Sequence, residues 1–243
     1  MKKLVLIMIL MLVTAGLLFP QQQSRIPLIG AKAPSFTANS TYGNITFPDD
    51  FGTSWKILFS HPQNFTPVCS SELLELAYMQ KEFEKFGVRL AVISTDDVAQ
   101  HKMWVAHLEE LDYKGRGVQK ITFPLFEDVQ GKISRTYGML HEPTSTSRDI
   151  RGVFILDSEN VVRSINFYPI KIGRNMHEIQ RIVLALKTTG QENVFTPANW
   201  TPGDDVIVPH FPYTKEQITE NPQLENDFYS VGNRMWFKKM DGK

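Results

Sequence analysis

Residues 55–69 have the sequence WKILFSHPQNFTPVC, a short apolar run followed by a polar loop and a helix start. The run 55–60 has the apolar content of a buried β-strand, and the proline and asparagine after it are typical of a loop. Thr66 is a good N-cap residue and Pro67 suits the first helical position, so a helix is predicted to begin there. This strand–loop–helix unit makes Cys69 the third residue of the helix.

The apolar pattern around this unit alternates between strand-like and helix-like periods. Helical spacing continues through Cys69, Leu73, Leu76, Ala77 and Phe83, and this helix is predicted to end before Gly87. Further strands are predicted at 88–94, 123–126, 152–156 and 161–167, and further helices at about 96–111, 130–137 and 175–186. The last two strands are separated by a turn-rich spacer and form a hairpin. We therefore expect an α/β fold with a mixed central sheet flanked by helices.

The chain changes character after Gly190. Five prolines, at 197, 202, 209, 212 and 222, interrupt every periodic pattern, so an irregular region is expected. The same region carries many large aromatic side chains, among them Trp200, Phe211, Tyr213, Phe228, Tyr229, Trp236 and Phe237. These are too many for a solvated linker, so we expect a small C-terminal domain over 191–243 that packs on the main domain or on a partner subunit.

The N-terminus has the layout of a targeting segment. Lys2 and Lys3 precede an uncharged, largely apolar stretch at 4–19, and Pro20 ends it. Residues 1–20 are therefore predicted to be a signal peptide, or a membrane anchor if uncleaved. Residues 21–31 form a linker and 32–190 the main domain. The expected location is exported, which means secreted, periplasmic or lumenal, or else membrane-anchored.

Composition excludes several classes of function. The 26 Lys and Arg balance the 26 Asp and Glu, so no net field attracts nucleic acid. No glycine-rich phosphate loop is present, which argues against a nucleotide cofactor. The six histidines show no metal-ligand spacing with cysteines or carboxylates, so neither a cofactor nor a metal is expected.

Cys69 is the only cysteine in the chain. An unpaired thiol in an exported protein is usually avoided unless it is buried or used. The first turn of a helix offers free amides and a dipole that stabilise a thiolate, and the Thr66 hydroxyl can interact with the Cys69 amide. The cation that completes such a site comes from Arg148, Arg151 or Arg174. These residues alone leave two hypotheses open: a reactive nucleophile and a small buried apolar residue.

The segment around Cys69 resembles the P-x-x-x-T-x-x-C site of peroxiredoxins, in the AhpC/TSA superfamily. The Ser-His-Pro opening at 60–62 is similar to the one-cysteine branch related to peroxiredoxin 6. Three further motifs support the resemblance: RGVFILD at 151–157, YP-x-x-x-GRN at 168–175 and TPANW-x-PGD at 196–204. Together the motifs extend the resemblance over about residues 26–208.

The resemblance implies a thioredoxin-like fold and a thiol-dependent peroxidase for hydrogen peroxide and alkyl hydroperoxides. The implied catalytic residues are Cys69, Thr66, Arg151 and Pro62, with His61 and Arg174 as supporting groups. Cys69 attacks the terminal peroxide oxygen and becomes a sulfenic acid. In this family pattern Pro62 shields the sulfur, Thr66 hydrogen-bonds thiolate and peroxide, and Arg151 favours the thiolate and the transition state.

The single cysteine has a direct consequence for the reductant. No resolving disulfide can form within the chain or between identical chains, so an outside thiol must reduce the sulfenate: a thioredoxin-like protein, glutathione or another small thiol. The resemblance also implies a homodimer or a larger ring. The alternative function is a non-catalytic thioredoxin-like scaffold or chaperone module. A dithiol oxidoreductase would need C-x-x-C, which this sequence lacks.

Overall fold

The computed structural model describes residues 26–240, so the predicted leader at 1–20 and the first part of the linker, 21–25, lie outside the described residues. The main body contains a seven-stranded sheet with the order β2-β1-β5-β4-β3-β6-β7. Its strands are β1 (Phe36–Ser40), β2 (Gly43–Phe47), β3 (Trp55–Ser60), β4 (Val88–Ser94), β5 (Leu125–Glu127), β6 (Arg151–Leu156) and β7 (Val162–Tyr168).

Strand direction in this sheet is mixed, as the sequence predicted. β3, β4 and β5 are parallel neighbours, whereas β6 pairs antiparallel with both β3 and β7. The ends of β3, β4 and β5 therefore lie at the same edge of the sheet as the start of β6. Ser60, Ser94, Glu127 and Arg151 mark this edge, which we call the site edge.

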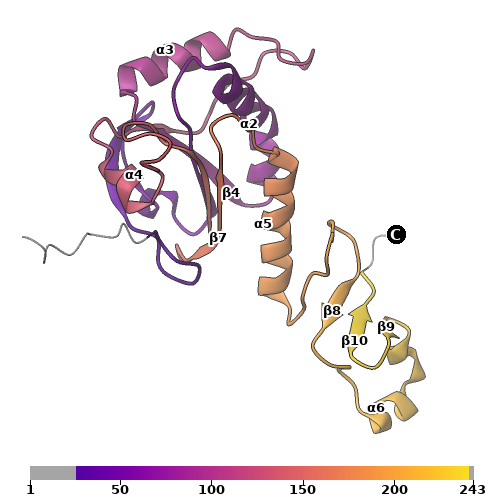
Figure 1. The fold of residues 1–243 in the computed structure, drawn as a ribbon. Helices are drawn as coiled ribbons and strands as arrows, with labels where there is room; N and C mark the ends of the chain where they lie inside the picture. The colour runs from indigo at the N-terminus through magenta and orange to yellow at the C-terminus, as the bar shows by residue number, and fades with distance from the viewer. Residues whose placement is uncertain (1–25, 241–243) are drawn as a thin grey trace, which may run out of the picture.

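Helices cover both faces of the sheet (Figure 1). One face packs against α2 (Pro67–Lys85), α3 (Val98–Leu108) and α5 (Met176–Gln191), and their shared core includes the buried Leu73, Trp104 and Ile179. The other face is covered around α4 (Lys132–Thr136) and the short 3-10 helix η1 (Asp49–Phe51), with a second core rich in aromatic side chains. Burial of both faces explains why β3 and β6 have nearly continuous apolar sequences.

The predicted helices and strands are present, with some ends displaced. β5 begins two residues later than predicted, and α4 is shorter at both ends. α3 ends at Leu108 rather than near 111, because the backbone tightens there: the amides of Glu110 and Leu111 donate to carbonyls three residues earlier, at 3.2 and 3.1 Å. α5 extends to Gln191, five residues beyond the expected end.

The C-terminal region is more regular than the prolines suggested. It contains a three-stranded sheet with the order β8-β10-β9 and a short helix. The elements are β8 (Val206–Val208), α6 (Lys215–Glu220), the 3-10 helix η2 (Pro222–Glu225), β9 (Phe228–Val231) and β10 (Met235–Lys238). Trp200 and Val206 are buried and pack with Leu184 and Ala185 of α5, so apolar burial organises the segment despite its prolines. Figure 1 shows this small unit joined to the main body through α5. Within residues 26–240, no helix combines the length and apolar character needed to cross a bilayer.

Candidate active site around Cys69

Cys69 lies in the first turn of α2, at the site edge, and its side chain is fully buried. The helix begins as predicted: Thr66 is the N-cap with extended dihedral angles, and Pro67 is the first helical residue. The Ser70 amide donates to the Thr66 carbonyl at 2.9 Å and closes the first turn. The sulfur therefore lies at the helix terminus where free amides and the dipole favour negative charge.

The Thr66 hydroxyl does not cap the helix. It donates to the backbone carbonyl of Gln63 at 3.0 Å, and α2 has no side-chain cap. The expected interaction between this hydroxyl and the Cys69 amide is therefore wrong. The reason is local: Phe65 adopts a left-handed backbone conformation, with φ of 56°, and the chain turns so that the Gln63 carbonyl lies within reach.

Arg151 provides the cation. Its Nη1 atom lies 3.3 Å from Cys69 Sγ, and the guanidinium is 1 % exposed. Nε and Nη2 both donate to the Ile170 carbonyl, at 2.9 and 2.7 Å, which fixes the plane of the group. The two other arginines considered from the sequence do not have this contact: Arg148 is exposed, and Arg174 binds neighbouring groups.

Glu72 joins Arg151 and Arg174 into one buried cluster, which we call the arginine–glutamate cluster. Its carboxylate accepts from Arg151 Nη1 at 2.7 Å, and from the backbone amide, Nε and Nη2 of Arg174 at 2.8, 2.9 and 2.7 Å. Sequence reasoning missed Glu72. The available signal was its position three residues after Cys69, on the apolar face that also carries Leu73, where a carboxylate needs a buried cation.

Arg174 also ties two strands together. Its Nη1 atom donates to the carbonyls of Ser60 and Gly152, each at 2.8 Å, at the end of β3 and the start of β6. With two guanidinium groups and one carboxylate, the arginine–glutamate cluster has an excess positive charge beside Cys69. A thiolate at Sγ balances that charge inside a buried site, where charge interactions are strong.

His61 and Pro62 lie in the loop between β3 and α2, and both are buried. His61 Nε2 lies 3.0 Å from Asn64 Oδ1, while Nδ1 has no hydrogen-bond partner among the described residues. Burial, reinforced by the nearby His101, holds the pKa of His61 well below its usual range. The ring packs on Trp104 at 5.1 Å between centroids. A buried, neutral histidine therefore lies in the loop that leads into α2.

A third buried group at the site edge is Asp149, two residues before Arg151. Neither of its oxygens has a hydrogen-bond partner within residues 26–240, because the nearby Ser134 hydroxyl donates to Asp128 at 2.7 Å. Burial, with repulsion from Asp128 and Asp96, raises the pKa of Asp149 to about 8. The carboxyl group is therefore mostly protonated at neutral pH.

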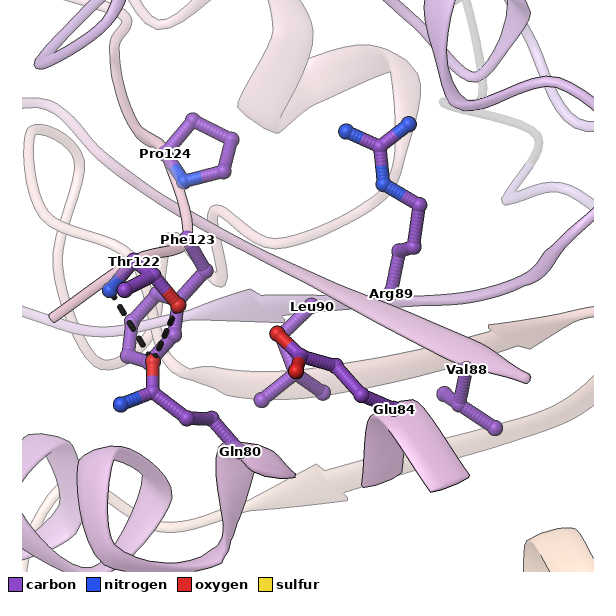
Figure 2. A pocket seen from close by; sticks show the side chains of 8 residues that line it. All are labelled: Gln80, Glu84, Val88, Arg89, Leu90, Thr122, Phe123 and Pro124. Atoms are coloured by element: carbon purple, nitrogen blue, oxygen red, sulfur yellow. Dashed lines mark hydrogen bonds between the residues drawn. The ribbon is translucent and has the colours of Figure 1, made fainter. Parts of the chain in front are cut away.

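A hollow elsewhere on the molecule is not part of the site. It lies between α2, β4 and the segment before β5, with a volume of about 50 Å³ (Figure 2). Figure 2 shows the Gln80 side chain accepting from both the amide and the hydroxyl of Thr122, at 3.0 and 2.7 Å. The hollow has room for little more than water. Over residues 26–240, no three His, Cys, Asp or Glu side chains are grouped to hold a metal ion.

Known proteins resemble this chain in sequence and in fold. The family model of the AhpC/TSA family matches residues 29–165, and the C-terminal domain of 1-Cys peroxiredoxin matches residues 185–220. A peroxiredoxin from Methanosarcina mazei is 46% identical over 203 residues, covering 83% of this chain and 92% of the relative.

Two solved structures are also similar. Peroxiredoxin 6 from Arenicola marina, as a cysteine-to-serine mutant, is 31% identical with a TM-score of 0.77, covering 89% of this chain and 99% of its own. The yeast mitochondrial 1-Cys peroxiredoxin, solved in a study of thiol resolution through glutathione and thioredoxin systems, is 32% identical with a TM-score of 0.75, covering 88% and 100%.

Fold, site and likenesses define the class as a thiol-dependent peroxidase on a thioredoxin-like fold, as expected from the sequence. The chain belongs to the AhpC/TSA family and is a peroxiredoxin. Its single cysteine fits the one-cysteine mechanism.

Proposed function

We propose that Cys69 is the peroxidatic residue and that Arg151 is its principal partner. The observation that carries this assignment is the distance of 3.3 Å between Arg151 Nη1 and Cys69 Sγ at a helix N-terminus. Arginine remains charged at all working pH values and donates several hydrogen bonds in one plane. It therefore stabilises both the thiolate and the negative charge that develops on the peroxide oxygens.

The reaction is a two-electron transfer. The Cys69 thiolate attacks the terminal oxygen of the hydroperoxide, an S–O bond forms and the O–O bond breaks. The leaving oxygen takes a proton and departs as water or an alcohol, and the sulfur becomes a sulfenic acid. Pro62 shields the sulfur from water, and Thr66 positions the peroxide with its hydroxyl. Glu72 and Arg174 hold Arg151 in place. His61 is a supporting group in the loop between β3 and α2.

Both hydrogen peroxide and alkyl hydroperoxides fit this site as substrates. Phe65 and Ile172 are 53% and 54% exposed, and each lies within two residues of a site residue, Thr66 or Arg174. Such exposed apolar side chains close in sequence to site residues suit the carbon chain of an alkyl hydroperoxide.

The sulfenic acid is reduced by an outside thiol. The first thiol forms a mixed disulfide with Cys69 and releases water, and a second thiol releases the enzyme. A thioredoxin-like protein, glutathione or another small thiol fits this role. The similar yeast protein, solved in a study of glutathione and thioredoxin systems, supports this proposal.

The proposal includes an assembly in which the chain forms a homodimer or a larger ring. Support comes from the C-terminal unit, where Phe195 and Met235 are 52% and 46% exposed and five further aromatic rings are only half-buried. The half-buried rings are Phe211, Tyr213, Phe228, Trp236 and Phe237. Such a surface is suited to burial against a second subunit.

Export, or anchoring to a membrane, remains the proposed location. It rests on the two lysines and the apolar stretch at 4–19.

Steady-state turnover tests the proposed function. A fragment that starts near residue 21 is supplied with dithiothreitol and then with hydrogen peroxide or cumene hydroperoxide, and peroxide loss is followed. We expect catalytic turnover that Cys69→Ser abolishes. Equal turnover by wild type and Cys69→Ser would refute the assignment of Cys69.

A further inference from the structure

Asn64 links two buried histidines at the site edge. The amide atom placed as Oδ1 lies 3.0 Å from His61 Nε2 and 3.2 Å from His101 Nδ1. His101 Nε2 lies 3.1 Å from the Phe126 carbonyl oxygen. The Asn64 backbone amide donates to Asp96 at 2.8 Å, which fixes the residue in place. We call His61, Asn64 and His101 the histidine–asparagine chain.

The Phe126 carbonyl decides where the proton of His101 lies. A carbonyl oxygen only accepts, so the Nε2 atom facing it carries the hydrogen. Burial lowers the pKa of His101, although Asp96, Asp97 and Glu127 act in the opposite direction, so the ring is neutral at pH 7. A neutral ring has one N–H group, and Nδ1 of His101 is therefore a hydrogen-bond acceptor.

The Asn64 amide must then turn its nitrogen toward both rings. An amide oxygen in this place would put two hydrogen-bond acceptors 3.2 Å apart, because Nδ1 of His101 carries no hydrogen. The NH₂ group can instead donate to that Nδ1 atom. The second hydrogen of the NH₂ group is directed to His61 Nε2, which accepts it. His61 is neutral too, because burial lowers its pKa, so its single hydrogen is on Nδ1.

We propose that Asn64 and His101 are positioning residues that hold His61 in the tautomer with its hydrogen on Nδ1. The Phe126 carbonyl fixes the hydrogen of His101 on Nε2, and the Asn64 amide then fixes the hydrogen of His61 on Nδ1. Without this chain, a neutral His61 could carry its hydrogen on either nitrogen.

The tautomer has a consequence for catalysis, and this part of the inference rests on the proposed function. His61 Nδ1 is buried without a partner among the described residues, and an unpaired buried donor is unfavourable. The ring packs on Trp104, whose indole N–H donates to the Ser70 hydroxyl at 3.3 Å, next to Cys69. On the proposed function, the acceptor that relieves this penalty is an oxygen atom of a bound peroxide or of the sulfenate.

Nitrogen NMR tests the tautomer directly. The protein is labelled with ¹⁵N-histidine, and long-range ¹H–¹⁵N correlation spectra are recorded at pH 7. His61→Gln identifies the His61 signals, and His177→Gln, at an exposed position of α5, serves as a control. We expect His61 with a protonated Nδ1 and a bare Nε2, and His101 with the reverse. A His61 hydrogen on Nε2, or a doubly protonated His101, would overturn the proposal.

Asn64→Asp tests the control of the tautomer by Asn64. A carboxylate only accepts, so the hydrogen of His61 should move to Nε2, and the rate of peroxide reduction should fall about tenfold, the effect of one lost hydrogen bond. Gln63→Glu adds the same charge one residue earlier and should preserve both the His61 spectrum and the rate. An unchanged His61 spectrum in Asn64→Asp would refute the role of Asn64.

The NMR result is independent of peroxidase activity. If wild-type Cys69 does not react with peroxide, the proposed function fails while the His61 tautomer is still measured. A confirmed tautomer with an unchanged Asn64→Asp rate would refute only the catalytic consequence.

Discussion

The site edge contains two groups of buried polar side chains that differ in how completely they are hydrogen-bonded. In the arginine–glutamate cluster, two guanidinium groups and one carboxylate are fully paired, through contacts of 2.7 to 2.9 Å to each other and to backbone carbonyls. The second group comprises His61, Asn64 and Asp149, and each of these side chains has at least one buried polar atom without a partner found in residues 26–240.

The difference separates two physical roles. A fully paired cluster of buried charges holds its geometry because any displacement leaves an uncompensated charge. Neutral groups with unused donors or acceptors cost less to keep and can pair with an arriving ligand or change protonation. The arginine–glutamate cluster therefore fixes Arg151 against Cys69, while the second group is adaptable. Four substitutions test this contrast.

Glu72→Gln should have the largest effect. It leaves the guanidinium groups of Arg151 and Arg174 buried with no carboxylate, so the free energy of unfolding should fall by about 3–5 kcal/mol. Urea denaturation measures the change. Glu178→Gln is the matched control, because its pair with Arg181 is 43% and 31% exposed and should contribute at most about 1 kcal/mol. Equal losses in the two variants would show that the cluster is not rigidly paired.

Arg151→Lys should slow peroxide reduction about 100-fold, equivalent to about 2.7 kcal/mol. Lysine keeps the charge, but one ammonium group cannot contact Sγ, Glu72 and the Ile170 carbonyl in the planar geometry of arginine. Stopped-flow mixing with peroxide gives the rate, and Arg163→Lys on the surface controls for the substitution type. A rate within a factor of about two of wild type would mean that charge alone suffices.

Asp149→Asn should stabilise the protein in a pH-dependent way. The pKa of Asp149 is raised from 3.8 to about 8, so between these values the unfolded chain is ionised while the folded chain keeps its proton. The contribution of Asp149 to the free energy of unfolding of the wild type therefore falls as pH rises toward about 8 and is constant above that.

Asp149→Asn has no carboxyl group at this position, so its free energy of unfolding does not fall with pH for this reason. Its advantage over wild type should grow by at most about 1.4 kcal/mol per pH unit and become constant above about pH 8. Denaturation curves at unit pH intervals from about 5 to 9 measure the difference, and the comparison of two proteins cancels other titrating groups. A difference that does not change with pH would show that Asp149 is ionised in the folded protein.

Thr66→Val should have the smallest effect, a loss of peroxide reduction of about tenfold. The hydroxyl donates to Gln63 rather than capping α2, so its removal deletes one hydrogen bond near the sulfur and leaves the helix start intact. Thr66→Ser keeps the hydroxyl and should restore the rate. Equally slow reduction in both variants would show that the hydroxyl alone does not account for the effect.

The fold was predictable where the apolar pattern was strong. The run 55–60, the helix from Pro67 and the hairpin of β6 and β7 are confirmed, because buried elements carry continuous or periodic apolar residues. The hairpin of β1 and β2 was not foreseen, since its strands are largely exposed or half-buried at a sheet edge. The sheet of β8, β9 and β10 was hidden by prolines.

The reacting residues of the site were predictable, but the buried residues that connect them were not. Cys69 and Arg151 are far apart in sequence, and the resemblance to peroxiredoxins brought them together before the structure placed them 3.3 Å apart. Glu72, Asn64 and His101 were missed, because their role depends on tertiary contacts between separate elements. The Thr66 hydroxyl was misassigned because the turn at Phe65 lets it donate to the Gln63 carbonyl instead of accepting from the Cys69 amide.

Single-turnover oxidation of Cys69 tests the central claim most directly. Reduced protein is mixed with one equivalent of hydrogen peroxide, and both peroxide loss and the mass of the Cys69 peptide are followed, with Cys69→Ser as control. The account predicts fast stoichiometric consumption and one added oxygen at Cys69, both absent in the variant. An inert Cys69 would contradict the account and favour a non-catalytic scaffold.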